Sequence, residues 1–141
     1  MESFSLHRKT RAGSSNKTEV QFLDFVVSGR SLYDELCRRG YDYVSCLGWL
    51  VAEYDREARE RLTLKAQSDL PDGRCALFIC PECADLGCGA ISAHVTQDGD
   101  WVTWSNIGYE NNYEDGYISE DQLGPFVFSA SEYIKAIESA T

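Results

Sequence analysis

Alternating apolar side chains along the chain predict several short strands joined by tight turns. Residues 20–27 are rich in branched and aromatic side chains and end at Ser28-Gly29, which is typical of a strand followed by a turn. Asp98-Gly99 is the sequence of a hairpin turn between two such runs. Further runs of this kind occupy residues 75–80, 89–95, 101–107 and 126–128.

A first helix is predicted over residues 32–37. Ser31 can cap its N-terminus, and Asp34 and Glu35 place negative charge in the first turn, where the helix dipole favours it. Arg38-Arg39-Gly40 supplies positive charge and a glycine stop at the other end. The start and the end of this helix are therefore both marked in the sequence.

Two further segments have helical spacing. Residues 43–60 predict a helix or a loop, and the alternation that begins at Leu62 predicts a strand after it. Residues 132–139 place their apolar side chains on one face, so we expect a final helix that is capped by Ser129 or Ser131.

Consecutive strands joined by short turns indicate the α+β class, with an antiparallel β-meander and helices packed on one face of the sheet. The chain of 141 residues is long enough for one domain to bury about 68–70% of its unfolded surface. Residues 1–18 are polar and basic and predict a flexible arm. We therefore expect a basic arm over residues 1–18 and a single α+β domain over residues 19–141.

The charge of the chain is concentrated in one window. The formal net charge is -10, yet residues 1–74 carry twelve basic and twelve acidic side chains. Residues 75–134 contain no lysine or arginine and ten carboxylates: Glu82, Asp85, Asp98, Asp100, Glu110, Glu114, Asp115, Glu120, Asp121 and Glu132. A surface of one sign repels nucleic acid and anionic membranes and attracts cationic partners.

The same window contains the cysteine cluster Cys80-x2-Cys83-x4-Cys88 between two predicted strands. Thiolates at this spacing are typical of zinc sites, in which His94 is the best fourth ligand because it shares a strand face with Cys88. Small thiols packed in the interior are the favoured interpretation, so we expect no cofactor, and zinc or a redox pair of Cys80 with Cys83 are the alternatives. The other candidates for the fourth ligand are Cys75, Cys46 and Cys37.

The residues favour a binding protein over an enzyme. His7 and His94 are the only histidines, no glycine loop for phosphate is present, and acidic neighbours disfavour a reactive thiolate at the cluster. Six cysteines without a secretory leader indicate reduced thiols, so we expect a cytoplasmic location. No apolar run has the length of a membrane span.

Three segments resemble a group of small, largely uncharacterised bacterial proteins. Residues 77–90 contain the Cys-Pro-Glu-Cys-x-Asp-Leu-Gly-Cys-Gly-Ala core of that group, and residues 104–113 resemble its tryptophan-bearing strand and its Tyr-Glu-Asn-Asn-Tyr loop. Residues 24–32 resemble its opening. The resemblance covers roughly residues 20–135 and implies no settled activity, so no functional residues are carried over.

Two functions fit these features. The first is an immunity-type protein that binds a cognate basic toxin and occludes its active site, using aromatic anchors within an acidic surface. The second is a small zinc- or thiol-containing structural or redox module. A mimic of DNA is a third possibility. The partner-binding residues that we expect are Asp98, Asp100, Tyr109, Glu110, Tyr113, Glu114, Asp115, Glu120 and Asp121.

Overall fold

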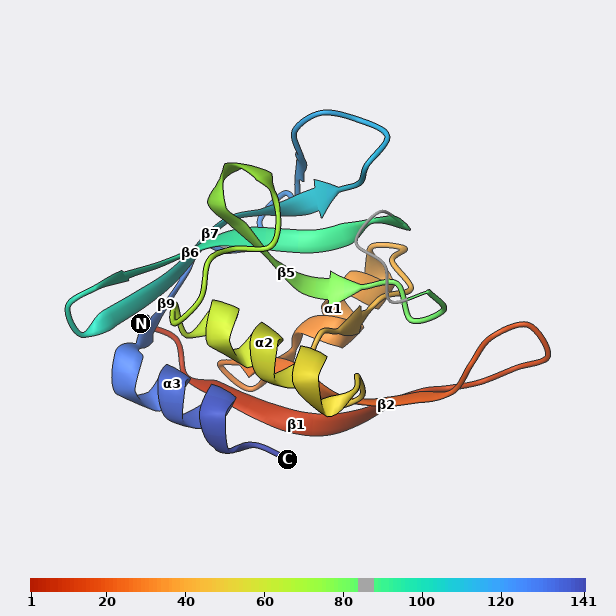
Figure 1. Cartoon of the computed structure of the whole chain (residues 1–141), viewed down its shortest axis with the longest axis horizontal. Helices are drawn as coiled ribbons and strands as arrows, with labels where there is room; N and C mark the ends of the chain where they lie inside the picture. The colour runs from red at the N-terminus through yellow and green to blue at the C-terminus, as the bar shows by residue number, and fades with distance from the viewer. Residues whose placement is uncertain (84–87) are drawn as a thin grey trace.

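The computed structural model describes residues 1–83 and 88–141, and a six-stranded antiparallel sheet is its largest element (Figure 1). Four of its strands follow one another in the order β4-β5-β6-β7, and β8 and β9 both pair with β7. The bounds are β4 Val44–Ser45, β5 Arg74–Ile79, β6 Ala90–Asp98, β7 Trp101–Glu110, β8 Ile118–Ser119 and β9 Phe126–Ser129. The predicted α+β class with an antiparallel meander is confirmed.

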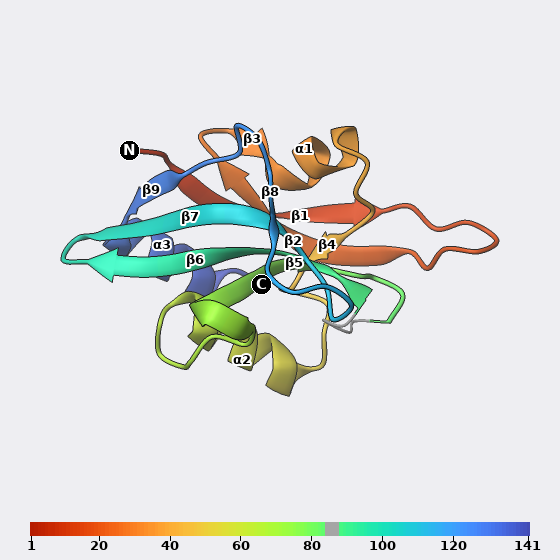
Figure 2. The same ribbon diagram turned by 90° about the horizontal axis from the view of Figure 1, so that it is seen from above.

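A second, three-stranded sheet contains β1 Phe4–Arg11, β2 Val20–Val27 and β3 Arg30–Ser31. The prediction of a flexible arm is wrong for most of its length, because β1 pairs with β2 along all eight of its residues. Phe4 is buried at the start of β1, and Arg11 is buried at its end. The long hairpin formed by the two strands extends to the side of the molecule in Figure 2.

Three α-helices lie on the side of the large sheet that faces β1 and β2 (Figure 1). They are α1 Leu32–Arg38, α2 Ala52–Leu62 and α3 Ala130–Ser139. Ser31 caps α1 by accepting a hydrogen bond from the Asp34 amide. Ser129 caps α3 by accepting a hydrogen bond from the Glu132 amide. Both caps confirm the sequence prediction.

The strand predicted to begin near Leu62 is wrong. Leu62 is the last residue of α2, and Leu64 has a left-handed backbone with φ +62°. The hydroxyl of Thr63 donates to the Arg59 carbonyl and closes the last turn. Leu62 is buried because it faces the core from the helix end, where its carbonyl accepts a hydrogen bond from Tyr133.

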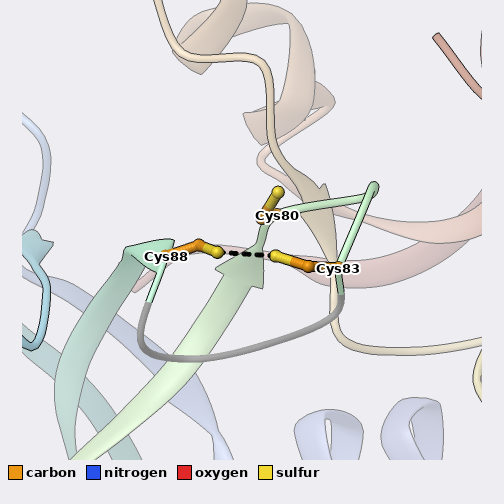
Figure 3. Close-up of side chains that lie close together, drawn as sticks. All are labelled: Cys80, Cys83 and Cys88. Atoms are coloured by element: carbon orange, nitrogen blue, oxygen red, sulfur yellow. Dashed lines mark hydrogen bonds between the residues drawn. The ribbon is translucent and has the colours of Figure 1, made fainter.

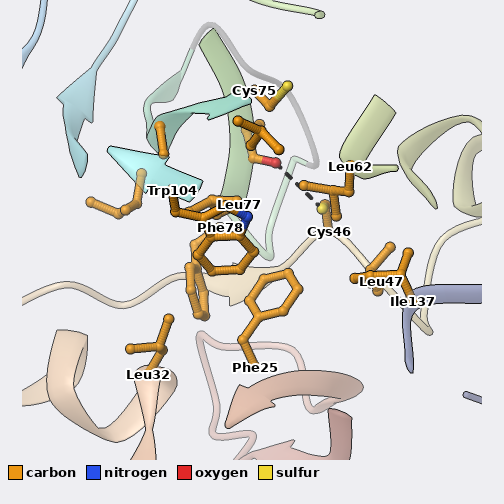
Figure 4. Close-up of a cluster of buried hydrophobic side chains, with 14 of the residues drawn as sticks. Phe25, Leu32, Cys46, Leu47, Leu62, Cys75, Leu77, Phe78, Trp104 and Ile137 are labelled. Atoms are coloured by element: carbon orange, nitrogen blue, oxygen red, sulfur yellow. Dashed lines mark hydrogen bonds between the residues drawn. The ribbon is translucent and has the colours of Figure 1, made fainter. Parts of the chain in front are cut away.

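The core lies between the two sheets (Figure 4). Phe25 of β2 packs edge-on against Phe78 of β5 and Trp104 of β7, with ring centroids 5.5 and 5.1 Å apart. The indole of Trp104 donates to the Tyr133 hydroxyl of α3, so its one polar atom is satisfied inside the core. Trp101 is exposed on the same strand, as expected for tryptophans on opposite faces.

Candidate functional site

The structure divides the acidic window into bonded and free carboxylates. The bonded carboxylates hold groups from distant parts of the chain: Glu82 binds Arg11, Glu110 binds Arg74, Glu120 binds Arg39, and Glu132 accepts from the Phe4 amide. Asp85 lies outside the described residues. A large part of the negative charge therefore stabilises the fold and does not form a free surface.

Four of the five free carboxylates lie at two ends of the large sheet, and the fifth, Asp121, follows β8. Within residues 1–83 and 88–141, no lysine or arginine comes within 4.0 Å of these five: Asp98, Asp100, Glu114, Asp115 and Asp121. Asp98 and Asp100 flank the β6–β7 turn, whereas Glu114 and Asp115 follow the other end of β7 (Figure 1). Because β7 has ten residues and is about 33 Å long, the predicted surface is two separate patches.

The loop of residues 111–118, which we call the acidic loop, combines free charge with exposed apolar side chains. Tyr113 is 86% exposed and Ile118 is 60% exposed, and Glu114 and Asp115 lie between them. Asn111 holds the loop, because its side-chain oxygen accepts from the amides of Tyr113 and Glu114 at 2.9 and 3.1 Å. The acidic loop therefore projects from the sheet in a conformation that its own hydrogen bonds hold.

Three of the predicted partner-binding residues have structural contacts instead. The ring of Tyr109 stacks on Tyr43 and Tyr41, with centroids 6.3 and 5.7 Å away. Glu120 accepts from the Tyr41 hydroxyl at 2.7 Å, and this burial and hydrogen bond raise the pKa of Tyr41 to about 12. Glu110 is buried. The polar atoms of these three side chains already form hydrogen bonds within the fold.

Below the acidic loop, Glu110 forms a buried ion pair that the sequence analysis missed. Arg74 is 2% exposed and Glu110 is 9% exposed. The Nε of Arg74 donates to Glu110 Oε2 and to Ser92 Oγ, both at 3.0 Å, and its Nη2 donates to the Ser92 carbonyl at 2.8 Å. The ring of Tyr117 covers the guanidinium, 3.7 Å from the centroid. The available sequence signal was an arginine at the start of an otherwise apolar strand.

At the other end of β5, the structure brings the three predicted cysteines together (Figure 3). The sulfur atoms of Cys80, Cys83 and Cys88 lie within 4.8 Å of one another, and Cys83 Sγ is 2.7 Å from Cys88 Sγ. Three thiolates at such distances are close enough to hold a metal ion such as zinc, with one coordination position left. Cys83 and Cys88 are exposed, so burial does not account for the cluster.

The prediction of His94 as the fourth ligand is wrong. His94 pairs with Arg74 across the two strands, at the end of β5 away from Cys80. Its two ring nitrogens lie 2.9 Å from the Asp72 carbonyl and 2.9 Å from the Asn106 amide. His94 is therefore too far along β6 from the cysteine cluster to complete a metal site.

The buried thiols belong to the core. Cys46 donates to the Ala76 carbonyl at 3.5 Å (Figure 4), and burial raises its pKa to about 12. Burial also raises the pKa of Cys75 to about 11. Both therefore remain protonated at neutral pH and behave as small apolar side chains.

A second buried arginine, Arg11, joins the β1–β2 hairpin to the turn that contains Cys80 and Cys83, which we call the cysteine corner. Arg11 is 4% exposed, and its guanidinium binds Asp42 through two hydrogen bonds of 2.9 and 2.7 Å and Glu82 at 2.7 Å. Glu82 also accepts from the amide and the hydroxyl of Thr18. The hydrogen bonds from Arg11 lower the pKa values of both Asp42 and Glu82.

Comparisons with family models, with curated proteins and with solved structures find no match to this chain. Among the described residues, no helix is both long and apolar enough to cross a membrane.

Proposed function

We propose that this protein is an immunity-type binding protein, which docks a basic toxin through the acidic loop and occludes the toxin's active site. One observation carries the proposal: Glu114 and Asp115 have no cation within salt-bridge distance among the described residues, and they lie between the exposed side chains of Tyr113 and Ile118. Free carboxylates attract a cationic partner, and aromatic side chains provide most of the binding energy at an interface.

The acidic loop is held in place by contacts within the protein, and this favours a binding surface over a loop that is only solvated. A flexible loop loses conformational entropy when it binds, whereas a loop that is already ordered loses less. Asn111 orders the acidic loop from within, and Gly108 allows it to lie close to the sheet. A Cβ at Gly108 would come within 2.4 Å of the Ile118 carbonyl oxygen, so only glycine permits this approach.

The free carboxylates at the β6–β7 turn add to the electrostatic field without belonging to the same contact surface. Asp98 and Asp100 lie at the far end of β7 from the acidic loop, beside the exposed ring of Trp101. Charges at this distance increase the rate of encounter, and this effect is screened by salt. They therefore provide a matched control for charge at the acidic loop.

A charge-reversal experiment tests the proposal. A basic partner is first captured from the source organism at low salt, and the purified pair is then measured by calorimetry. We expect Glu114→Lys with Asp115→Lys to weaken binding by more than a hundredfold, because two attractive contacts become repulsive. The control, Asp98→Lys with Asp100→Lys, should weaken it by less than tenfold. Equal effects of the two double variants would contradict docking at the acidic loop.

The second candidate function is a zinc- or thiol-containing structural or redox module, favoured by the spacing of Cys80, Cys83 and Cys88. Elemental analysis tests it: one zinc per chain that is lost in Cys83→Ser would support a zinc site. Cys37→Ser is the matched control, since Cys37 is an exposed thiol outside the cluster. Zinc in the corner would be compatible with docking at the acidic loop, because the two sites use different residues.

A further inference from the structure

The guanidinium of Arg74 has one nitrogen without an acceptor. Its Nε and Nη2 bind Glu110 and Ser92, whereas Nη1 is buried and has no hydrogen-bond partner among the described residues. A buried donor without an acceptor is unfavourable, and native proteins retain few of them. An unpartnered donor at the floor of a cavity is therefore a mark of a binding site.

Arg74 lines a cavity of about 390 Å³ between the acidic loop and the segment before β5. Four acidic residues also line it: Asp72, Glu110, Glu114 and Asp115. The charge of Arg74 is matched by Glu110, so the remaining carboxylates make the cavity negative. A free anion such as phosphate is disfavoured there, whereas a neutral acceptor next to a cation fits both features.

We propose that this cavity receives a basic peptide segment, whose main-chain carbonyl accepts a hydrogen bond from Arg74 Nη1 while its lysine or arginine side chain lies beside Glu114 and Asp115. The inference rests on the proposed function and names the part of the partner that the acidic loop recognises. A carbonyl satisfies the free donor without adding charge, and the cationic side chain supplies the attraction.

Tyr117 controls access to the donor. Its ring lies 3.7 Å above the guanidinium and it is partly exposed at the cavity wall. Because Nη1 has no exposed surface, a group that covers the guanidinium must move when the peptide binds, and we infer that this group is the Tyr117 ring. Gly116, with φ +76°, precedes Tyr117 and can absorb the change of backbone direction. Binding should therefore change the environment of Tyr117 together with that of Arg74.

Four small probes separate the requirement for a carbonyl from the requirement for a cation. In the full-length protein, the Nε–H resonance of Arg74 is followed by NMR during titration with N-acetyl-arginine methylamide, which has both a carbonyl and a cation. Butylguanidinium has only the cation, N-acetyl-alanine methylamide has only the carbonyl, and inorganic phosphate is the anion control. We expect the arginine derivative to bind at least tenfold more tightly than each of the others and to shift Arg74 and Tyr117 together.

Equal binding of butylguanidinium would reduce the cavity to a simple cation site, and binding of phosphate would make it an anion site; either result would overturn the inference. So would an unshifted Arg74 resonance at saturating N-acetyl-arginine methylamide. Arg74→Lys retains the charge but removes Nη1, so it should weaken binding tenfold. If this variant does not fold, the comparison of the four probes on the wild-type protein still tests the inference.

The partner complex distinguishes this inference from the proposed function. If Arg74→Lys binds the basic partner as tightly as wild type, while Glu114→Lys with Asp115→Lys does not, then docking at the acidic loop stands and recognition in the cavity fails. If neither variant loses affinity, both fail.

Discussion

Glu110 and Glu114 are four residues apart, and yet they have opposite roles. Glu110 ends β7, is buried and binds Arg74, whereas Glu114 lies in the acidic loop and binds no cation within the described residues. Glu82 and Glu120 belong with Glu110, because each is bonded to an arginine from an earlier part of the chain. One acidic window therefore contains both carboxylates that are bonded within the fold and carboxylates that are left free.

The largest effect should follow from breaking the buried pair. Glu110→Ala leaves the guanidinium of Arg74 buried without its counter-charge, and we expect a loss of about 3–5 kcal/mol in the free energy of unfolding. Urea denaturation measures it. The exposed partner in this comparison, Glu114→Ala, should change the free energy of unfolding by less than about 0.5 kcal/mol. Similar losses in the two variants would remove the distinction between bonded and free carboxylates.

The next effect concerns Arg11, which joins the β1–β2 hairpin to Asp42 and Glu82. Arg11→Met removes hydrogen bonds to charged groups while retaining much of the side-chain volume, so we expect a loss of about 2 kcal/mol in the free energy of unfolding. Lys17→Met is the matched control, since Lys17 contacts the same Asp42 at the surface. Lys17→Met should lower the free energy of unfolding by less than about 0.5 kcal/mol, measured by the same urea denaturation.

The contribution of Arg11 should depend on pH. Its hydrogen bonds lower the folded-state pKa values of Asp42 and Glu82, so the stabilisation is fully present above their unfolded pKa values, about 4. It is lost as the pH falls through the lower, folded values. The difference in unfolding free energy between wild type and Arg11→Met should therefore shrink below pH 4. A difference that stays constant from pH 6 to pH 3 would contradict this coupling.

The smallest effect on stability should come from neutralising the acidic loop. Glu114→Gln with Asp115→Asn should change the free energy of unfolding by less than about 0.5 kcal/mol, because neither carboxylate is paired within the fold. The same change should slow association with the basic partner and flatten its dependence on salt. Stopped-flow measurements at several salt concentrations test this, and an unchanged association rate would contradict steering by the loop.

Elements with local signals were predictable. Ser31 and Ser129 cap their helices by accepting hydrogen bonds from amides three residues later, so each donor and its acceptor are close together in the sequence. One of Trp101 and Trp104 was expected in the core because they fall on opposite strand faces, and the three cysteines were expected within one turn region. Each of these predictions rests on residues that are close together in the sequence.

Elements with distant partners were not predictable. The polar sequence of β1 resembles a flexible arm, and only pairing with β2 and the packing of Phe4 against Phe128 and Tyr133 make it a strand. Arg74 looked like the ordinary start of a strand, because its partners Ser92 and Glu110 are 18 and 36 residues away. His94 failed as a ligand for a related reason: its pairing with Arg74 places it at the end of β5 away from Cys80.

The sequence by itself determined the strands β2, β5, β6, β7 and β9, the helix caps, the total charge and the acidic character of residues 75–134, because these depend on composition and on neighbours a few residues apart. Only the tertiary structure decided which carboxylates remain free. Arg11, Arg39 and Arg74 each come from the electrically neutral part of the chain and bind a carboxylate of the acidic window. Each pairing depends on the three-dimensional meeting of strands and loops, so charge along the sequence does not give charge on the surface.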